Sequence, residues 1–560
     1  MRNRSIVRAG LAGILAVIVV ASSTAATGKF GQSQKAGVLR MSIGAEPPSL
    51  DAGLATDTTS SSILFNLMDP LIRLGPGPSL KPLPGAAASW TVKGANITLK
   101  LRKNVRWTNG KPTVAQDYVF SWLRTISPEL GADYAYQFFG IKGAEAYNSC
   151  AGGKDAKGNA CDESALRNAV GIKAPSKYTL KVTLTSPQPW FIQQLSHTSF
   201  LPVYKPALDQ YGNKFTEAGN FVGNGPFKLA SWKHDASLTL VKNTKWRNAK
   251  SVKLNRIEMQ IITEGTTAEN AFDAGNIDLN TTGVPPSDIP KYKKLAGGSR
   301  KGALGPAGKA IQIDPALGTY YYGFNIKNIS DVNQRRAMAF AIDRKAIVRY
   351  ITQAGQVPAK GFTPGGIAGG PTIDKNSFMP ASHQTSKAQS FMNKVASPKK
   401  SIKLYINNSP AHIKIATAIQ AFWNGLGIST KIQTMEWKQY LQFLGPPPNS
   451  DVDVYRLGWI YDFPDAYNGL VLWTCDSGNN NTNWCNKKYD SLIVQATKTP
   501  DFDKRVAVYQ KAESILTGPS GDLPIMPIYW YTFTVYVHKN VHGFLTSPTS
   551  QYDFTKVSVS

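Results

Sequence analysis

The sequence predicts an α/β fold, and three neighbouring segments carry this prediction. Ser401–Asn407 (SIKLYIN) alternates apolar and polar residues as a strand does, and Ser429–Met435 (STKIQTM) reads as a second strand. Between them, Ala411–Leu426 places its apolar residues at helical spacing, and Gly427 ends that helix. A strand, a helix and a strand at this spacing form a βαβ unit, whose strands pair in parallel through a right-handed crossover.

Other elements along the chain fit the same class. We expect a turn at Trp107–Pro112 before a helix that begins near Thr113, and a turn at Gly223–Pro226 before a strand at Phe227–Trp232. Over Glu269–Leu279 we expect the end of a helix that passes through Gly275 into a strand. Two further helices are expected at Arg336–Ile351 and Lys504–Leu516. Stretches rich in Pro and Gly are expected as loops at Gly75–Gly85, Gly361–Pro371 and Gly445–Ser450. None is a long linker, so the domains are expected to be interwoven.

The N-terminal residues 1–26 resemble an export signal. The cationic start MRNRSIVR is followed by the apolar run Ala9–Ala21 and by small residues, which predict cleavage near Ala25 or Ala26. No later segment approaches the roughly 20 apolar residues that span a bilayer. No cysteine stands near the cleavage site, so we expect no lipoprotein anchor. The protein is expected in the periplasm, or at the outer face of the cytoplasmic membrane or in the cell wall; an uncut signal acting as a tether is an alternative.

The four cysteines fall into two close pairs in polar, Gly- and Asn-rich stretches. We expect two local disulfides, Cys150–Cys161 and Cys475–Cys485, which suits an exported protein. A metal site at Cys475 and Cys485 is the alternative, but the segment CDSGNNNTNWC has neither CxxC spacing nor a nearby histidine.

The chain is strongly basic, with 63 Lys and Arg against 36 Asp and Glu. Three of the basic residues lie in the export signal, so its removal leaves 60 and a net charge of +24. An anionic envelope surface is a possible partner of such a field, and a solvated surface is the plainer interpretation. The basic residues are dispersed along the chain, so we expect no nucleic-acid partner.

Motifs of enzyme chemistry are missing from the sequence. No GxGxxG, P-loop, HExxH or GxSxG pattern occurs, and the six histidines are dispersed. We therefore expect a protein that is not an enzyme and that carries no cofactor.

The stretch Asp451–Leu470 contains the most informative residue, Asp462. A predicted strand runs into a Gly-Trp pair, and Asp462 then stands among the aromatic residues Trp459, Tyr461, Phe463 and Tyr467. A carboxylate that water reaches poorly needs a cation or several hydrogen-bond donors. Asp462 could instead cap a turn before Pro464.

Several segments together resemble one family. They are LRMSIGAEPPSLDAG near the mature start, LRKNVRWTNGKPTVAQDYVFSW at Leu101–Trp122, FVGNGPFKLASW at Phe221–Trp232, LVKNTKWRNAKSVKLNRIEM, YYYGFNIKN and TMEWKQYL. In this order they are similar to extracytoplasmic solute-binding proteins, family 5, of ABC peptide importers, and most similar to the oligopeptide-binding branch. The resemblance covers nearly the whole mature chain.

This resemblance implies a periplasmic-binding-protein-like fold of type II, in its three-lobed peptide-binding variant. Lobe I would be discontinuous (36–85, 218–317 and 531–560), lobe II would be inserted (86–217), and lobe III would comprise 318–530. The lobes would close by a hinge around an extended peptide. A monomeric receptor would then deliver the peptide to the transmembrane subunits of an ABC permease.

The resemblance also implies the ligand-binding residues. Asp462 would pair with the α-ammonium of the peptide, Gly458 to Ile460 would offer a strand edge with Trp459 as a wall, and Thr56 and Thr58 would lie at the opposite edge. Arg456 and His412 match positions near the peptide's carboxylate, and Trp437, Tyr322 and Tyr134 match pocket aromatics. A structural ion pair for Arg456, a helix start for His412 and a core position for Trp437 are the alternatives.

The chain also departs from the oligopeptide branch. Gly323 stands where that branch often has an acid, and Gly318 and Ile460 stand where it has a cysteine pair. We expect peptides of about three to five residues. A nickel chelate, haem or an oligosaccharide on the same fold, or a wall-associated role in peptide signalling, are alternative functions.

Overall fold

The computed structural model describes residues 36–560 except 76–79, 284, 296–308, 377–378 and 446. Ala36–Ser560 form one compact unit. The export signal predicted at 1–26 lies outside the described residues. Within the described part of the chain, no helix is both long and apolar enough to span a membrane.

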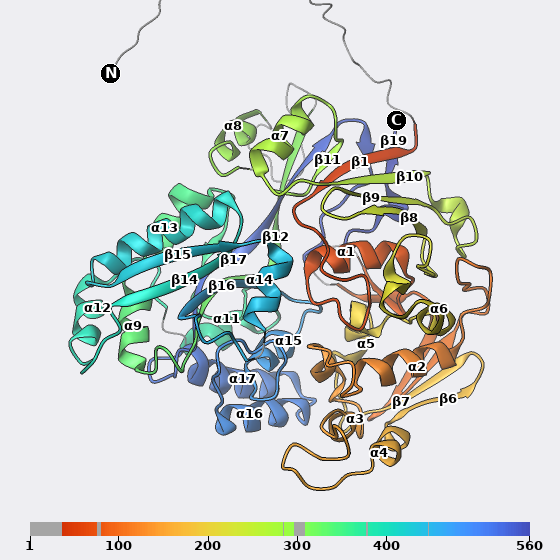
Figure 1. The fold of residues 1–560 in the computed structure, drawn as a ribbon, viewed down its shortest axis with the longest axis horizontal. Helices are drawn as coiled ribbons and strands as arrows, with labels where there is room; N and C mark the ends of the chain where they lie inside the picture. The colour runs from red at the N-terminus through yellow and green to blue at the C-terminus, as the bar shows by residue number, and fades with distance from the viewer. Residues whose placement is uncertain (1–35, 76–79, 284, 296–308, 377–378, 446) are drawn as a thin grey trace, which may run out of the picture. The chain divides into compact units, whose positions relative to one another are not determined.

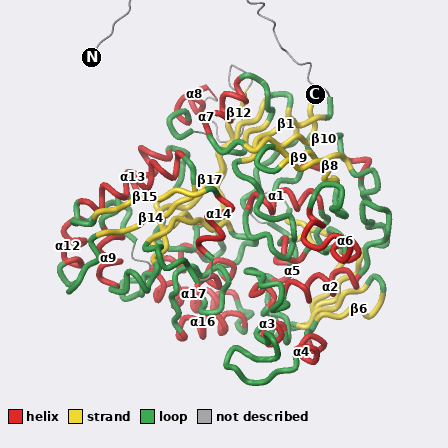
Figure 2. Tube along the Cα trace, in the orientation of Figure 1, coloured by secondary structure: helices red, strands yellow, loops and turns green. Residues whose placement is uncertain are grey.

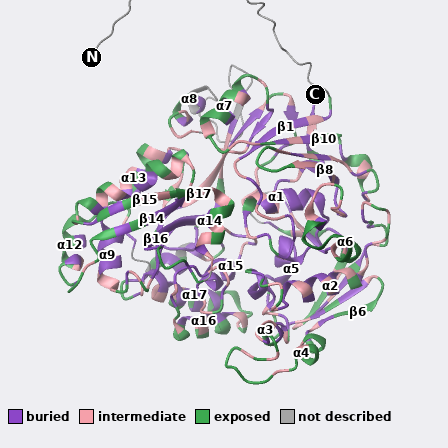
Figure 3. Ribbon diagram, in the orientation of Figure 1, coloured by how far each residue is buried: buried purple, intermediate pink, exposed green. Residues whose placement is uncertain are grey.

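Most strands belong to one large mixed sheet (Figure 1). Its order over the described residues is β15 (Ser429–Met435), β14 (Ser401–Asn407), β16 (Val454–Ile460), β12 (Lys309–Phe324), β17 (Ile525–His538), β11 (Leu279–Asn280), β1 (Val38–Ile43), β10 (Arg256–Ile261), β9 (Ser237–Lys242) and β8 (Phe227–Lys233), with β13 (Val357–Pro358) paired to β17. Figure 3 shows these strands largely buried.

The predicted βαβ unit is confirmed. Strands β14 and β15 pair in parallel from Ser401↔Ser429 to Asn407↔Met435, and α13 (Pro410–Asn424) connects them. The helix packs its buried residues Ile415, Ile419 and Trp423 against Ile402, Leu404 and Ile406 of the strand. The α/β class is therefore correct.

Strands β12 and β17 join the two ends of the large sheet. They pair with each other, antiparallel, from Gly323↔Ile525 to Lys309↔His538, with a register shift between Pro315 and Thr319. The C-terminal half of β12 also pairs with β16, whereas β17 pairs with β11 near its own C-terminal end. The predicted lobe boundaries at 317/318 and 530/531 fall inside these two long strands. These boundaries remain predictions.

A second sheet lies wholly within residues 86–217, the range predicted as the inserted lobe. Its order is β4 (Ala87–Lys93), β5 (Asn96–Leu101), β7 (Thr179–Thr183) and β6 (Ile172–Ser176). Helix α2 (Ala115–Thr125) packs on it with Tyr118, Trp122 and their apolar neighbours. Asp117 accepts hydrogen bonds from the Val114 backbone and the Trp107 indole, which fixes the turn before this helix.

The expectation of one helix over Arg336–Ile351 is wrong. The chain forms α9 (Val332–Phe340), a turn, α10 (Arg344–Ala346) and a π-helical segment at Ile347–Thr352. The side chain of Arg344 is fully buried and donates hydrogen bonds to the carbonyl groups of Ala339, Pro380 and Pro527. A buried guanidinium that needs backbone acceptors interrupts the helix, and this need is invisible in the spacing of apolar residues.

The other expected elements are present. The structure has α17 at Phe502–Thr517, and α7 (Gly265–Asp273) leads through Gly275 towards β11. The stretch 75–85 is not loop throughout, because β3 (Pro82–Pro84) pairs there with β2 (Ile72–Leu74). The stretch 361–371 contains the start of α11 (Gly370–Ile373).

Short helices joined by long loops cover the sheets (Figure 2). Those not yet given are α1 (Thr58–Leu67), α3 (Ala144–Asn148), α4 (Glu163–Ala169), α5 (Phe191–Gln194), α6 (Lys205–Tyr211), α8 (Ile289–Leu295), α12 (Thr385–Met392), α14 (Trp437–Leu444), α15 (Tyr467–Leu470) and α16 (Lys487–Thr497), and the short strands β18 (Val541–His542) and β19 (Ser558–Val559) pair with each other.

Candidate ligand-binding site

A cavity of about 600 Å³ lies beside β16. Segments far apart in the sequence line the cavity. They are the start of α1, loops within residues 86–217, helices α13 and α14, strands β16 and β17, and the loop before α16. Ten of the eleven predicted ligand residues are in its wall, namely Thr56, Thr58, Tyr134, His412, Trp437, Arg456, Gly458, Trp459, Ile460 and Asp462. Tyr322 is not among the lining residues, because it is fully buried against Tyr320.

Asp462 is the second residue after β16 and lies in the cavity wall, with its side chain 15% exposed. Its Oδ1 lies 3.3 Å from Nε2 of His197. Its Oδ2 accepts hydrogen bonds from Nδ2 of Asn468 (2.9 Å) and, more weakly, from Nε2 of Gln137 (3.5 Å). Within the described residues, no Lys or Arg pairs with this carboxylate. Amide and imidazole donors orient Asp462 without supplying a permanent positive charge.

Asn468 holds Asp462 and Trp459 together. Its fully buried carboxamide accepts hydrogen bonds from the Trp459 indole and the Asp462 backbone N–H, both at 3.0 Å, and donates to the Asp462 carboxylate. The wall tryptophan and the acid are therefore fixed as one unit. Asp462 does not cap a turn, since its side-chain oxygens accept from side chains rather than from the following backbone.

His197 is oriented by its own backbone. Its Nδ1 accepts a hydrogen bond from Ser199 N at 3.2 Å, so in the neutral ring the proton is on Nε2, which faces Asp462. The ring of Tyr134 lies edge-on at 4.8 Å from the His197 ring and at 6.0 Å from the Trp459 ring. His197 and Tyr134 thus contact residues at the end of β16.

One edge of β16 is open along most of its length. On one side the strand pairs with β12 from Gly318↔Ile460 to Phe324↔Val454, and on the other β14 pairs only with Val454 and Tyr455. The backbone of Arg456 bonds the Tyr440 hydroxyl, whereas Tyr461 N bonds Leu317 O in the direction of β12. Because antiparallel ladders alternate, the N–H and C=O of Gly458 and Ile460 point to the open side.

Arg456 places a buried cation at the other end of this edge. Its guanidinium donates to Tyr531 Oη at 2.7 Å and to Asn407 Oδ1 at 3.1 Å, and it lies 4.3 Å above the ring of Tyr320. Nε of Arg456 has no hydrogen-bond partner in the described part of the chain. No carboxylate pairs with Arg456 among the residues that the structure describes, so the ion-pair alternative is not realised there.

His412 lies in the same wall, near the start of α13. Its Nδ1 is 3.3 Å from the Tyr320 hydroxyl. Burial, and then the nearby charge of Arg456, lower the pKa of His412 well below its usual value. The imidazole is therefore neutral at pH 7 and offers hydrogen bonding rather than charge.

The starts of two helices also line the cavity. Asp57 caps α1 by accepting from Thr59 N and Ser60 N, which positions Thr56 and Thr58. Glu436 caps α14 in the same way, so that Trp437, at the first position of that helix, is partly buried in the cavity wall.

Two departures from the oligopeptide branch have a steric explanation. A Cβ on Gly318 would lie 2.5 Å from Cδ1 of Ile460, so the isoleucine fills the place that a second side chain would take. A Cβ on Gly323 would lie 2.2 Å from the ring of Tyr455, which excludes an acidic side chain there in the present packing.

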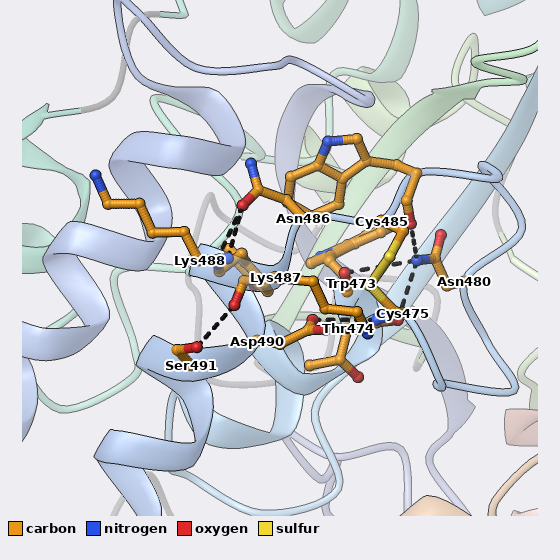
Figure 4. Close-up of a disulfide and its surroundings, with 12 residues drawn as sticks. Trp473, Thr474, Cys475, Asn480, Cys485, Asn486, Lys487, Lys488, Asp490 and Ser491 are labelled. Carbon is orange, nitrogen blue, oxygen red and sulfur yellow. Dashed lines mark hydrogen bonds and ion pairs between the residues drawn. A yellow bond between two sulfur atoms is a disulfide. The ribbon is translucent and has the colours of Figure 1, made fainter. Parts of the chain in front are cut away.

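Both predicted disulfides are formed, Cys150–Cys161 and Cys475–Cys485. Asp490 is near the second pair, where it accepts a hydrogen bond from the Cys475 backbone at 3.1 Å (Figure 4). Because the two sulfur atoms are bonded to each other, they are not thiolate ligands, and the alternative of a metal site is not realised.

Sequence reasoning missed five side chains at the site: Gln137, His197, Asn468, Asn479 and Asn481. A histidine preceding Thr-Ser in a polar turn carries no recognisable signal. The run Asn479 to Asn481 inside a predicted disulfide loop was the one usable sign, since a constrained polar loop can present amides to a ligand.

Comparisons with known proteins identify the family of this chain. The family described as bacterial extracellular solute-binding proteins, family 5 Middle, matches residues 81–481. The chain is 31% identical over 558 residues to the oligopeptide-binding protein OppA of Bacillus subtilis (strain 168), covering 97% of both chains.

Two solved structures are also similar over nearly the whole chain. Haemophilus influenzae OppA in complex with the peptide RPPGFSPFR has a TM-score of 0.83 and 25% identity, and covers 94% of this chain and 99% of its own. The Escherichia coli murein tripeptide binding protein MppA has a TM-score of 0.82 and 27% identity, with the same coverage. The unliganded open form of MppA gives only 0.60, with coverage of 94% and 98%.

Proposed function

This chain belongs to the bacterial extracellular solute-binding proteins, family 5, and we propose that it is the peptide-binding receptor of an ABC importer. It would bind short peptides outside the cytoplasm and deliver them, as a monomer, to the transmembrane subunits of a permease. The proposal assigns it no catalytic step. The named relatives include an oligopeptide-binding protein and a peptide complex, which support a peptide over a metal chelate, haem or a sugar.

One observation carries the proposal: an open strand edge with a carboxylate at one end and, at the other, a guanidinium that pairs with no carboxylate among the described residues. The backbone groups of Gly458 and Ile460 face the cavity on the side opposite β12. Asp462 stands beyond the C-terminal end of this edge, and Arg456 stands near its N-terminal end. A zwitterionic peptide matches both charges and the hydrogen-bonding edge at once.

The peptide would lie antiparallel to β16, with its ammonium at Asp462 and its carboxylate at Arg456. Its main chain would bond Gly458 and Ile460, and such bonds do not discriminate between side chains. His412 would donate or accept a further hydrogen bond at the carboxylate end. Trp437, Tyr134 and Trp459 would form walls for the side chains, which a receptor for many sequences can leave loosely packed.

The distance along the strand limits the length of the ligand. Six residues of extended chain, as between Arg456 and Asp462, span about 20 Å. The two charged side chains take up part of this span, which leaves room for roughly three to five extended residues between them. Longer peptides would need an exit for one terminus.

Contacts across the cavity support closure around the ligand. His197 and Gln137 reach Asp462 from the inserted segment 86–217, and Tyr134 reaches Trp459. The lower similarity to the unliganded open form of MppA is consistent with a closed arrangement here. A peptide would bind while these contacts are open and be enclosed when they form.

Native mass spectrometry of gently purified protein tests this function. We expect co-purifying peptides of narrow length and mixed sequence, bound one to each protein monomer. Retention of a metal, haem or sugar, or no binding of any peptide from a mixed tripeptide to pentapeptide pool, would contradict it.

A further inference from the structure

The sheet β4-β5-β7-β6 has one packed face and one solvated face. Leu99 and Val182 are buried with helix α2 on the packed face (Figure 1). Successive side chains of a strand point to opposite faces of the sheet, so their neighbours along each strand lie on the solvated face. Four exposed lysines lie there, one from each strand: Lys93, Lys100, Lys181 and Lys173. We call these four residues the lysine face.

The strand register brings lysines of neighbouring strands together. Lys173 of β6 is paired with Lys181 of β7, and Lys181 is paired in turn with Thr98, two positions before Lys100 on β5. Like charges at directly opposed positions destabilise a sheet. None of the four strands contains an Asp or Glu that would offset this repulsion. The fold therefore carries a repulsion that its own stability does not explain.

The bonds that these lysines make are to neutral groups. Lys100 Nζ donates to Thr179 Oγ1 at 3.2 Å, and Lys173 Nζ donates to the carbonyl of Asn168 at 2.6 Å. Within the described residues, none of the four lysines has a carboxylate partner. The paired positions beside them hold Ser, Thr or Asn, among them Ser89, Thr91, Asn96 and Thr98. The face thus combines uncompensated positive charge with neutral hydrogen-bonding groups.

Protection of the sheet edges accounts for two of the four lysines. Lysines on edge strands prevent pairing with another chain, and β4 and β6 are the edges of this sheet. This explains Lys93 and Lys173. It does not explain Lys100 and Lys181, because β5 and β7 are the central strands. A function of the face as a whole explains all four.

The geometry of the lysine face fits a broad polyanion rather than one small anion. Neighbouring strands are about 4.8 Å apart, so the two outer strands lie roughly 15 Å apart. A bilayer rich in anionic lipid presents its phosphates as a two-dimensional array, which attracts lysines without the insertion of apolar side chains. The net charge of +24 that remains without the export signal acts in the same direction.

We propose that the lysine face binds the surface of a membrane rich in anionic phospholipid. The ammonium groups contact the headgroup phosphates, and the hydroxyl and amide groups beside them donate hydrogen bonds to phosphate oxygens. None of the four lysines lines the ligand cavity, so membrane contact and ligand binding use different residues. The inference does not depend on the identity of the ligand.

Cosedimentation with vesicles tests this contact. The protein is used without residues 1–26, because an export signal binds lipid by itself. We expect binding to vesicles of about 30% phosphatidylglycerol in phosphatidylcholine, and at least about tenfold weaker binding to phosphatidylcholine alone. Binding to the anionic vesicles should be lost in about 0.5 M sodium chloride, because salt screens the attraction.

Three quadruple variants locate the contact on the lysine face. Lys93→Gln/Lys100→Gln/Lys173→Gln/Lys181→Gln is expected to weaken binding to the anionic vesicles at least about tenfold. The corresponding four Lys→Arg substitutions keep the charge and should stay within about threefold of the parent. The control removes four exposed lysines that have no carboxylate partner in the described residues, and should also stay within about threefold: Lys394→Gln/Lys431→Gln/Lys438→Gln/Lys498→Gln.

Circular dichroism and thermal unfolding establish that each variant is folded. Should the first variant fail to fold, Lys100→Gln/Lys181→Gln decides, with an expected loss of at least about threefold. Tetra-alanine binding of the folded variants, measured by calorimetry, should equal that of the parent, which separates this inference from the peptide-binding function.

Several results would overturn the membrane assignment. A parent that does not bind the anionic vesicles, or that binds neutral vesicles equally well, has no such contact. Equal losses in the lysine-face variant and in the control would show that only net charge matters. Binding to soluble polyphosphate without binding to vesicles would assign the face to a polyanion that is not a lipid surface.

Discussion

Nε2 of His197 lies 3.3 Å from Oδ1 of Asp462, and this contact links the turn before Ser199 to the residues that follow β16 at the cavity. The two residues are 265 positions apart in the sequence. Nδ1 of the histidine is occupied by Ser199 N, so the contact has a defined donor and acceptor. The carboxylate proposed to bind the peptide is therefore also a point of contact between the walls that enclose it.

Removal of the Asp462 charge should weaken peptide binding strongly. Asp462→Asn keeps the shape and one acceptor but leaves the peptide ammonium without a countercharge in a closed cavity. We expect tetra-alanine affinity, measured by calorimetry, to fall by about 2–4 kcal/mol. Asp476→Asn, an exposed neighbour outside the cavity lining, should bind as the parent does. An unchanged affinity in Asp462→Asn would remove this residue from the site.

Loss of His197 should weaken closure without removing the main charge. His197→Ala deletes the donor to Asp462 and part of the contact with Tyr134. We expect a reduction in tetra-alanine affinity of about 0.5–1.5 kcal/mol, with a matching shift of small-angle scattering profiles of the peptide complex towards a more open form. His234→Ala is the control because that histidine is outside the cavity lining. Tighter binding in His197→Ala would show instead that the histidine competes with the ammonium.

Arg456 should recognise the peptide carboxylate. In the parent protein, amidation of the C-terminus of tetra-alanine is expected to weaken binding by about 1.5–3 kcal/mol, the range for a charge-assisted hydrogen bond. In Arg456→Gln the same amidation should change the binding free energy little, because the carboxylate charge that amidation removes no longer has a cationic partner. Calorimetry with four combinations of protein and peptide measures this coupling. Additive losses would place the carboxylate elsewhere.

Asp374 should make stability depend on pH. Burial, and then the nearby Glu513, raise the pKa of Asp374 to about 10, and the opposing effects of the Thr363 backbone and of Lys360 are smaller. The folded protein keeps this proton while the unfolded chain releases it near pH 4. Between these two values the folded state binds more protons, so stability falls as pH rises.

Asp374→Asn removes the need for that proton. We expect the variant to match the parent near pH 4 and to be more stable at pH 9, by about 1–3 kcal/mol. Chemical denaturation at the two pH values measures the difference, with the exposed Asp503→Asn as control. A variant that is less stable than the parent at pH 9 would show that Asp374 is charged and compensated in the fold.

The sequence was sufficient for the elements whose signals are local. Alternation over Ser401–Asn407 and helical spacing after Pro410 depend on near neighbours, and both elements formed as expected. The helix predicted over Arg336–Ile351 failed because its interruption depends on the carbonyls of Pro380 and Pro527, far away in the chain. Long-range requirements of this kind leave no periodic trace.

The residues of the candidate site likewise divide into those that the local sequence marks and those that only folding brings together. Asp462 could be singled out because its aromatic neighbours are adjacent in the sequence, and the family resemblance supplied Arg456 and His412. Asn468, Gln137 and His197 act on Asp462 only after folding brings them together, and nothing in their own surroundings in the sequence marks them. The open edge of β16 is likewise a property of the sheet, because it depends on where β14 stops pairing.

The central claim is that Asp462 binds the amino terminus of an extended peptide. Its most direct test is calorimetry of free and N-acetylated tetra-alanine with the parent protein and with Asp462→Asn. Acetylation should cost the parent about 2–4 kcal/mol and cost the variant less than about 0.5 kcal/mol. Equal costs of acetylation in the two proteins, or equal affinity of the parent for both peptides, would contradict the account.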